Sequence, residues 1–519
     1  MKSTPNPSAS VPNCTDLELA DEDGTIRLAE AVAAAARPGD TILLAGDLGA
    51  GKTAFARALI RAVADDESLE VPSPTFTLVQ TYDLDRFRIA HVDLYRLSDP
   101  AELDELGLDD FAADGLVMAE WPERAPGRFG ENRLEIHLSV DTTTPDARHA
   151  RLTAFGNWSA RLARLTEVRD ILDRLGYGDW RRRFLKGDAS TRRYERLSTD
   201  GSRAVLMDSP AMPDPGTGTV PYSRIAHLAE SVTPFVAIAR ELKARGFSTP
   251  EILACDLDAG VLVTEDLGVK TVLDADGIPD EERYGAAIDV LAALHAMDLP
   301  DTAVAEPGTV HRLPRYDMEA FLIEVSLLVE WYAPYVTGQP LPDAAVAEFR
   351  ALWDDVLFDF TDPIRHRTWV LRDYHSPNLM WLPDRDGIAR VGILDMQDAV
   401  VGPDAYDVAS LVFDARVDMS DRFWRELYAR YIAERQIADP SFDVEGFDRE
   451  FAILSAQRNT KILGIFARLY KRDGKPDYLA HIPRISTYLE IALNHPVLGG
   501  LRVWYDTHLP DELRRRATD

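Results

Sequence analysis

Two separate groups of residues in this 519-residue sequence have the types and spacing that phosphate chemistry requires. The first is "GDLGAGKT", Gly46 to Thr53, which fits the pattern Gly-x-x-x-x-Gly-Lys-Thr without mismatch. The second is "VLRDYHSPNLMWL", Val370 to Leu382, which contains Asp373 and Asn378 in the pattern Asp-x-x-x-x-Asn. More than 300 residues separate the two groups, so the sequence predicts two independent sites.

The first group lies between a predicted strand, "DTILLAGD", and a predicted helix, "KTAFARALIRAVAD", which is the context that a phosphate-binding loop requires. Its glycines let backbone N–H groups turn toward phosphate oxygens, and the helix N-terminus adds its positive end. We expect Lys52 to hold the β- and γ-phosphates of ATP and the Thr53 hydroxyl to ligate Mg²⁺. The predicted nucleotide-binding residues here are Asp47, Leu48, Gly49, Ala50, Gly51, Lys52 and Thr53.

The elements around this loop alternate between predicted strands and helices from Leu17 to about Phe155. "TIRLAEAVAAAAR" is predicted to be helical, and "FRIAHVDLYRL", "GLVMAEW" and "NRLEIHLSV" are predicted strands. Such alternation favours an α/β domain with a largely parallel sheet. Glu120 would then lie at the carboxyl end of a strand, where ligands collect in parallel sheets.

The sequence "GDLGAGKT", followed by "VPSPTFTLVQTYD", "HVDLYRL", "DELGLDDF" and "VMAEWPER", resembles the TsaE family. These proteins are the P-loop ATPases of bacterial tRNA threonylcarbamoyladenosine (t6A) modification. The resemblance implies that Thr53 and Glu120 bind Mg²⁺, that Asp93 orients water or magnesium, and that Thr75 senses the γ-phosphate. It also implies ATP hydrolysis beside TsaB- and TsaD-like subunits that perform the transfer. Without the resemblance, two alternatives stay open: Glu120 could be a surface carboxylate, and Asp93 could end its strand only as a turn residue.

The second group matches the catalytic loop of kinases, with "GILDMQDA" supplying Asp395 after a short apolar strand. We expect Asp373 to accept the proton of an acceptor hydroxyl or to orient that hydroxyl. Asn378 and Asp395 would hold magnesium against the ATP phosphates. Taken alone, Asp-x-x-x-x-Asn is more often a solvated polar loop, but the strand-borne Asp395 favours the catalytic interpretation.

The second unit, predicted to begin near Ser159, resembles the aminoglycoside phosphotransferase-like kinases. The segments that carry the resemblance include "GDASTRRYERL", "VLMDSP", "TEDLG", "RDYHSPNLMWL" and "RLYKRDGKPDYLAHIPR". Within that group they are most similar to the AmgK cell-wall sugar kinases, which implies phosphorylation of the anomeric hydroxyl of N-acetylmuramate or N-acetylglucosamine. The implied fold is a two-lobed α+β protein-kinase-like domain, mostly helical from about Asp274.

The predicted organisation is a disordered tail at 1–16, a P-loop ATPase domain at 17–157 and a kinase domain at 160–519. The N-lobe of the kinase domain would span about 160–268 and the C-lobe about 269–519. The two parts look unrelated to each other, which suggests a gene fusion and not a duplication.

The kinase part departs from its family at one position. Phosphotransferases of the wider group carry an ATP-binding lysine in the strand that here reads "RAVLMDSP", where Leu206 and Met207 stand instead. Arg192 or Arg193 could supply the missing charge, because a guanidinium pairs well with phosphate. We favour Arg193, although both could be surface residues. Glu265, in "TEDLG", is expected to mark the hinge where backbone groups hold adenine.

Three further features leave their role open. The aromatic residues of "VEWYAPYV" could present a ring face to a sugar, but aromatic stripes in helices more often belong to the core. His375 is expected to orient the catalytic loop and not to act as a base. Asp404 and Asp407 are expected to brace that loop through hydrogen bonds.

Composition limits the partners and the location. The 87 acidic residues outnumber the 57 basic ones, giving a net charge of −30, so we expect tRNA to be reached only indirectly, through a partner. Two cysteines and no long apolar run suit a cytoplasmic protein without a membrane span. The acceptor could also be an aminoglycoside or a choline-like alcohol. The absent lysine leaves open a nucleotide-binding pseudokinase scaffold.

Overall fold

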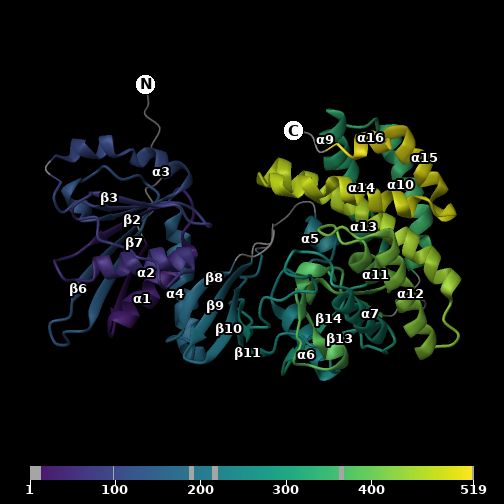
Figure 1. Cartoon of the computed structure of the whole chain (residues 1–519), viewed down its shortest axis with the longest axis horizontal. Helices are drawn as coiled ribbons and strands as arrows, with labels where there is room; N and C mark the ends of the chain where they lie inside the picture. The colour runs from purple at the N-terminus through teal and green to yellow at the C-terminus, as the bar shows by residue number, and fades with distance from the viewer. Residues whose placement is uncertain (1–12, 98, 186–191, 213–219, 362–367, 517–519) are drawn as a thin grey trace. The chain divides into compact units, whose positions relative to one another are not determined.

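The computed structural model describes residues 13–97, 99–185, 192–212, 220–361 and 368–516. The chain divides into two compact units (Figure 1). The first contains Met1–Ser209 and Leu253–Asp266, and the second contains Pro210–Ile252 and Leu267–Asp519. The first unit therefore includes both the phosphate-binding loop and the strands predicted for the kinase N-lobe. The predicted domain boundaries themselves stay a prediction.

The first unit has a seven-stranded sheet in the order β1-β7-β6-β2-β5-β4-β3. Its four central strands, β6, β2, β5 and β4, run parallel, and the outer strands pair antiparallel. The prediction of a largely parallel sheet is thus correct only for the centre. The strands are β1 (Asn13–Leu19), β2 (Thr41–Ala45), β3 (Val79–Tyr82), β4 (Ile89–Asp93), β5 (Leu116–Glu120), β6 (Arg133–Val140) and β7 (Arg148–Ala154).

Strand β1 corrects one sequence-based expectation. It begins at Asn13 and so includes the last four residues of the tail predicted for 1–16. Its residues alternate between half-buried and exposed positions up to the buried Leu19, and all seven pair with β7. Pairing satisfies backbone groups that a loose tail would leave to water. Residues 1–12 lie outside the described residues.

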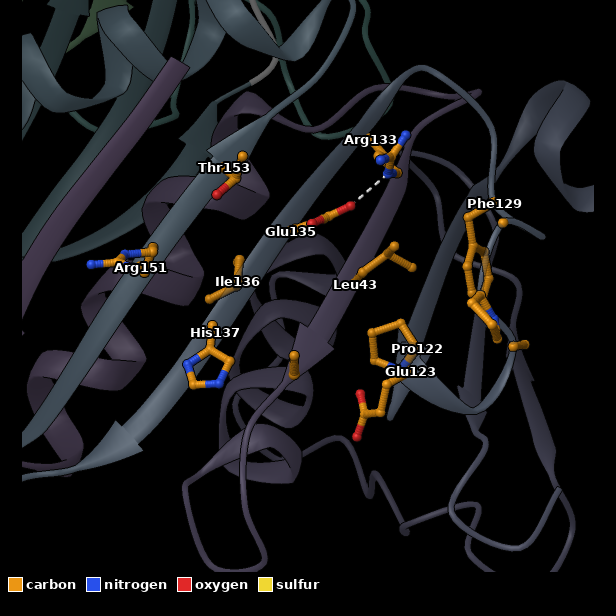
Figure 2. A pocket seen from close by; sticks show the side chains of 14 residues that line it. Leu43, Pro122, Glu123, Phe129, Arg133, Glu135, Ile136, His137, Arg151 and Thr153 are labelled. Atoms are coloured by element: carbon orange, nitrogen blue, oxygen red, sulfur yellow. Dashed lines mark hydrogen bonds and ion pairs between the residues drawn. The ribbon is translucent and has the colours of Figure 1, made fainter. Parts of the chain in front are cut away.

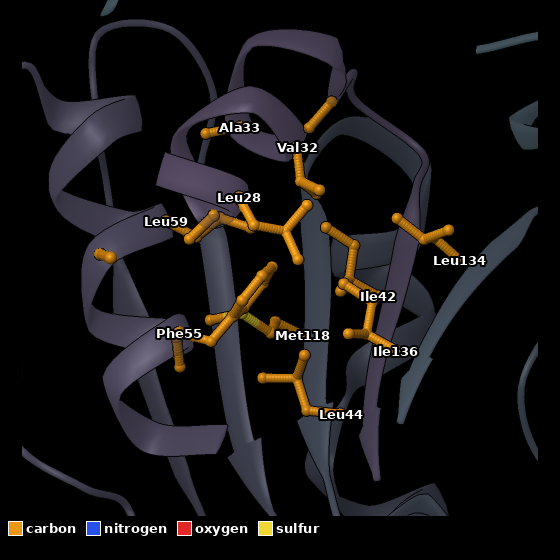
Figure 3. Packing of buried hydrophobic residues seen from close by; sticks show 14 of the residues in the cluster. Leu28, Val32, Ala33, Ile42, Leu44, Phe55, Leu59, Met118, Leu134 and Ile136 are labelled. Atoms are coloured by element: carbon orange, nitrogen blue, oxygen red, sulfur yellow. The ribbon is translucent and has the colours of Figure 1, made fainter. Parts of the chain in front are cut away.

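Helices α1 (Glu22–Ala35) and α2 (Lys52–Ala64) cover one face of the central strands. The Asp21 side chain begins α1 by accepting a hydrogen bond of 2.7 Å from the N–H of Gly24. Figure 3 shows Leu28 of α1 and Phe55 of α2 packed over strand residues, Ile42 among them. This packing fixes the start of α2, and with it the phosphate-binding loop, at the carboxyl end of β2. A short helix, α3 (Leu108–Asp114), lies before β5.

A second sheet in the same unit is antiparallel, in the order β11-β12-β10-β9-β8. Helix α4 (Trp158–Leu175) serves both sheets, because its first half packs in the core of the seven-stranded sheet and its second half in the core of the five-stranded one. The strands are β8 (Arg181–Leu185), β9 (Arg193–Thr199), β10 (Ser202–Asp208), β11 (Ile252–Asp256) and β12 (Val261–Glu265).

A buried carboxylate adds a second link between these two sheets. The Glu30 side chain on α1 is fully buried and accepts from the backbone N–H of Arg182 at 2.8 Å. Arg181 Nε donates to it at 2.5 Å, and Arg183 completes the group. A buried carboxylate is stable only when paired and hydrogen-bonded, as Glu30 is here.

The second unit is mostly helical, as predicted from about Asp274. The 30-residue helix α13 runs through it and packs against α8, α11 and α14. The helices are α5 (Tyr222–Ile225), α6 (Thr233–Ala244), α7 (Glu281–His295), α8 (Met318–Leu327), α9 (Ala333–Thr337), α10 (Asp343–Leu357), α11 (Ala405–Val412), α12 (Asp421–Ala438), α13 (Val444–Asp473), α14 (Ile482–Leu493), α15 (Gly499–His508) and α16 (Asp511–Arg514).

Three antiparallel strand pairs interrupt these helices: β13 (Thr302–Glu306) with β14 (Thr309–Arg312), β15 (Thr368–Val370) with β18 (Val400–Gly402), and β16 (Leu379–Trp381) with β17 (Val391–Ile393). The last two pairs carry the kinase-like motifs. Among the described helices, none combines the length and the apolar character that a membrane crossing needs.

Candidate active sites

The phosphate-binding loop follows β2 directly and ends at the N-terminus of α2. Gly46 has φ +130°, and a Cβ there would lie 2.1 Å from the carbonyl oxygen of Leu138, so only glycine fits. Gly51 takes φ +107° immediately before α2. Both glycines are needed for the tight turn that directs backbone N–H groups inward.

Lys52 is 5% exposed and is held by its own loop. Its Nζ donates to the carbonyl oxygens of Gly46 at 2.6 Å and Asp47 at 2.9 Å. The same ammonium lies 3.5 Å from the centroid of the Trp121 ring. Burial lowers the pKa of Lys52, and the nearby carboxylates, Glu120 foremost, act against this shift. A phosphate oxygen at the loop would therefore compete with two backbone carbonyls for this ammonium.

Thr53 and Glu120 meet, as the resemblance implies. The Thr53 hydroxyl donates to the two carboxylate oxygens of Glu120, at 3.0 and 3.2 Å. Glu120 is 2% exposed, and His91 Nε2 lies 2.9 Å from its Oε1. The interpretation of Glu120 as a surface carboxylate is thus wrong.

Asp93 and Thr75 also meet at this edge of the sheet. Asp93 is the last residue of β4 and pairs in register with Glu120 on β5. Its Oδ2 accepts from the Thr75 hydroxyl at 2.8 Å, and its Oδ1 accepts from the N–H of Tyr95 at 3.0 Å. Sheet register and these hydrogen bonds therefore place Thr53, Thr75, Asp93 and Glu120 together at one edge of the sheet, where β4 and β5 end.

A separate cavity of about 430 Å³ lies on the same sheet. Figure 2 shows Leu43 and Phe129 in its apolar part and a charged rim in which Arg133 Nε donates to Glu135 Oε1 at 2.7 Å. None of the residues predicted for the phosphate site lines this cavity. The phosphate site depends on the loop and the strand ends instead.

The kinase-like motif forms a tight loop after β15. Arg372, buried and with φ +69°, turns the backbone there. The carboxylate of Asp407 accepts from the backbone N–H groups of Leu371 at 2.6 Å and Arg372 at 2.8 Å. Asn378 Nδ2 donates to the carbonyl oxygen of Asp373 at 2.9 Å. The expected bracing by Asp407 is therefore correct.

Asp395 reaches the same place through the β16–β17 pair. Asn378 directly precedes β16, Asp395 follows β17, and the N–H of Leu394 donates to the carbonyl oxygen of Asn378 at 2.8 Å. Asp395 has φ +55°, a strained conformation for a residue other than glycine, and its Oδ1 accepts from Gln397 Nε2 at 2.9 Å. The three kinase candidates, Asp373, Asn378 and Asp395, thus share one pair of adjacent loops.

A fully buried carboxylate stabilises the conformation of the kinase-like loop. Glu324 on α8 pairs with Arg372, which also donates to the carbonyl oxygen of Ala226 at 2.7 Å. Lys461 Nζ of α13 lies 2.8 Å from Glu324 Oε1, and Gln457 Nε2 donates to Oε2 at 2.9 Å. These positive charges keep the pKa of Glu324 below its ordinary value even though burial acts to raise it. The pairing holds Arg372 in place and with it the turn into Asp373.

Asp373 is the accessible member of the loop, with its side chain 41% exposed. Burial acts to raise its pKa, but charge from His375 and from the basic residues of α13 holds the pKa below its ordinary value. His375 is 7% exposed, and its Nε2 lies 3.9 Å from Asp373 Oδ1. Burial is the main cause that lowers the pKa of His375 to about 4, so this ring is neutral near pH 7. A neutral histidine here fits a positioning role.

The remaining candidates of the kinase part lie in the first unit. Arg193 begins β9, opposite Asp208 in register, and burial lowers its pKa. Arg192 directly precedes that strand, and Glu265 ends β12. Leu206, at the position without a lysine, is fully buried in the core of the five-stranded sheet. The part of the predicted phosphate loop at 186–191 lies outside the described residues.

Packing decides one open alternative and corrects one expectation. Tyr332 is fully buried, and its hydroxyl donates to the carbonyl oxygen of Arg514, so this residue has the core role that the sequence favoured and offers no ring face to a sugar. Asp404 accepts from Arg435 Nη1 at 2.8 Å instead of bracing the catalytic loop. In both cases helix packing decides the role, which a linear motif does not reveal.

Sequence reasoning missed three residues at these sites. His91 lies inside the quoted segment "HVDLYRL", two residues before Asp93, so strand alternation could have placed it on the same side of the sheet as Asp93. Glu324 and Lys461 come from helices far from the catalytic loop in sequence. For Glu324 the available signal was a glutamate in the middle of a largely apolar helix, "MEAFLIEVSL".

Comparison with known proteins assigns the two motifs to different families. Residues 19–150 match the model of the family "Threonylcarbamoyl adenosine biosynthesis protein TsaE", and residues 181–446 match that of the phosphotransferase enzyme family. A TsaE protein of Rickettsia felis is 41% identical over 124 residues, which are 24% of this chain and 72% of that protein.

A kinase of Caulobacter vibrioides named for N-acetylmuramate and N-acetylglucosamine is 39% identical over 364 residues, 66% of this chain and 95% of that one. A solved aminoglycoside phosphotransferase with ADP bound is similar at 14% identity, with a TM-score of 0.40, over 64% of this chain and 98% of that one. The chain is thus a fusion that belongs to the TsaE family through its N-terminal part and to the phosphotransferase enzyme family through its C-terminal part.

Proposed function

We propose that this protein has two ATP-dependent activities. The N-terminal part is the ATPase of tRNA t6A modification, and the C-terminal part phosphorylates the anomeric hydroxyl of N-acetylmuramate and N-acetylglucosamine. The observation that carries the kinase proposal is the convergence of Asp373, Asn378 and Asp395 on two adjacent loops. The similarity to sugar kinases over most of their length supports the choice of acceptor.

In the proposed kinase reaction, Asp373 Oδ accepts the proton of the anomeric hydroxyl as the sugar oxygen attacks the γ-phosphorus of ATP. The bond from that phosphorus to the β–γ bridging oxygen breaks, and ADP leaves. The low pKa of Asp373 keeps the carboxylate ionised near neutral pH, so it is ready to orient the hydroxyl. Phosphoryl transfer depends mainly on such positioning and on charge neutralisation.

In the proposed ATPase reaction, backbone N–H groups of the loop and Lys52 bind the phosphates. Asp93 and Thr75, joined by their 2.8 Å hydrogen bond, orient the attacking water and contact the γ-phosphate. Trp121 covers the ammonium of Lys52 and limits its contact with water.

The residues at both sites fit Mg²⁺, which prefers oxygen ligands. The first donor set is the Thr53 hydroxyl with the buried carboxylate of Glu120, and the second is Asn378 with Asp395. Within the described residues no group of three His, Cys, Asp or Glu side chains could hold a metal ion unaided, so phosphate oxygens would complete each site. When bound, the ion would neutralise phosphate charge.

We further propose that Arg193 replaces the absent lysine and that Glu265 marks the adenine hinge. The expected partners are TsaB- and TsaD-like subunits, which would hold the tRNA, and the expected location is the cytoplasm. The acidic surface charge of the chain supports an indirect role toward tRNA.

The test is product identification after incubation with ATP, Mg²⁺ and each sugar. We expect a sugar 1-phosphate from the wild type and from Lys52→Ala, and none from Asp373→Asn. Loss with both variants, or with neither, would contradict two independent sites. ATP hydrolysis in the presence of TsaB- and TsaD-like proteins should show the opposite pattern.

A further inference from the structure

Helix α13 presents a row of cations along one face, in a chain whose net charge is −30. Arg458, Lys461 and Arg468 are separated by three and seven residues, a spacing that places them on the same side of a helix. Lys461 is paired with Glu324 at 2.8 Å, and the guanidinium of Arg468 lies 4.9 Å from the centroid of the Tyr222 ring. Lys461 therefore has an ion-pair partner and Arg468 an aromatic one, although Arg468 Nε has no hydrogen-bond partner within the described residues.

Arg458 is the exception. It is 5% exposed, and within the described part of the chain its Nε and Nη1 have no hydrogen-bond partner. Buried donors without acceptors are rare because they have lost water without a replacement, and each such group requires an explanation. A bound ligand that supplies a hydrogen-bond acceptor to Arg458 is one such explanation.

The position of Arg458 indicates which bound molecule would supply the missing hydrogen-bond acceptor. Lys461, about one turn further along α13, pairs with Glu324, which in turn pairs with Arg372, the residue directly before Asp373. The charge of Arg458 also acts on Asp373 and on His375 in the same loop. Asp373 is the group expected to face the acceptor hydroxyl, whereas Asn378 and Asp395 are expected to face the nucleotide. A cation close to Asp373 is therefore placed to meet the acceptor molecule.

We propose that Arg458 binds a carboxylate of the acceptor sugar and makes the kinase selective for an anionic amino sugar. This inference rests on the proposed kinase function. N-acetylmuramate has the ring of N-acetylglucosamine with an added lactyl ether, and the lactyl carboxylate is the group that the neutral sugar lacks. The planar guanidinium donates two parallel hydrogen bonds to a carboxylate, a geometry that lysine does not reproduce.

A purely structural role for Arg458 makes a different prediction. If the guanidinium only balances the charge of Asp373, its loss should affect both sugars equally, through kcat. If it binds the lactyl carboxylate, its loss should act mainly on KM and only for the sugar that carries the carboxylate. The ratio of kcat/KM for N-acetylmuramate to kcat/KM for N-acetylglucosamine separates the two roles.

The experiment measures this ratio for the full-length protein and for Arg458→Gln, Arg458→Lys and Arg449→Gln. Arg449 is the matched control, because it lies on the same helix and is about half exposed, with its ion pair to Asp359 at 3.4 Å. We expect the ratio to fall about 10- to 100-fold in Arg458→Gln, the usual loss for a charged hydrogen bond, and mainly through KM. Arg458→Lys should give an intermediate ratio, and Arg449→Gln should leave it unchanged.

A thermal unfolding curve accompanies each variant. The Tm of Arg458→Gln should not fall, because the substitution removes a buried cation that lacks hydrogen-bond acceptors. An unchanged ratio in either folded Arg458 variant, or an equal loss for both sugars, would overturn the inference while leaving the kinase function intact. If the wild type phosphorylates neither sugar, the proposed function itself fails, and the inference with it.

Discussion

The two nucleotide sites are assembled in different ways. The phosphate-binding loop is eight consecutive residues, and its lysine is held by two carbonyls of the same loop. The kinase-like loop is held from outside, by Asp407 on α11, Glu324 on α8 and, through Glu324, Lys461 on α13. The first site depends mainly on local geometry, whereas the second depends on a buried network drawn from distant segments. Substitutions should therefore act differently at the two sites.

The largest effect is expected for Asp373→Asn, which removes the proposed proton acceptor of the kinase. Sugar phosphorylation should fall by about 10⁴-fold, the upper range for a general base, because an amide cannot take the proton. The fold should persist, since Asn has the same shape. A coupled assay of ADP release with each sugar measures the effect, with the exposed Asp384→Asn as control. Retention of more than a tenth of the activity would contradict the assignment.

Lys52→Ala should abolish the other activity and leave the kinase intact. The loop would lose the cation at the β- and γ-phosphates, so we expect a loss of about 10²- to 10³-fold in ATP hydrolysis. Single-turnover ATP hydrolysis measures this, with Arg57→Ala on the same helix as the control. A matching loss of sugar kinase activity would show that the two sites are not independent.

Glu324→Gln tests whether the second site depends on its buried network. The substitution leaves the charges of Arg372 and Lys461 buried without a counter-charge, so the free energy of unfolding should fall by about 3 kcal/mol. Urea unfolding measures it, with Glu319→Gln at the exposed start of α8 as control. Kinase activity should fall as well, and hydrolysis at the P-loop should not. If stability is unchanged, the network does not support the loop as described.

The smallest effect concerns the pH dependence of stability through His375. The unfolded chain takes up a proton on this ring below its ordinary pKa of 6.5, whereas burial delays uptake in the folded protein to about pH 4. The contribution to stability is thus complete above pH 6.5 and is lost as the pH falls from 6.5 to 4. The slope due to one such group is at most about 1.4 kcal/mol per pH unit.

In His375→Gln, the free energy of unfolding should depend less steeply on pH over that interval than in the wild type. Chemical denaturation at several pH values measures the difference between the two slopes. Parallel slopes would show that His375 titrates alike in the folded and unfolded chains.

Much of both sites was predictable from the sequence because their motifs are contiguous. The spacing from Gly46 to Thr53 and from Asp373 to Asn378 carries its own geometry, so the strand, the turn and the helix start could be placed without a fold. The roles of Asp93 and Glu120 were also predictable, since both residues end apolar strands that meet at one sheet edge. The antiparallel pairing of the outer strands could not be predicted, because apolar and polar residues alternate in the same way in parallel and antiparallel strands.

The environment of those motifs could not be predicted from the sequence, because it depends on how distant segments pack. Charge neutralisation and burial act through space, so Glu324 became a partner of Arg372, and Arg458 became a buried cation with donors that are unpaired within the described residues, only once the helices packed together. The same packing placed Tyr332 in the core and Asp404 beside Arg435. The residue types and their spacing already identify which groups can do the chemistry. Folding decided their charge environment, because the strength of an electrostatic interaction depends on distance and burial and not on sequence separation.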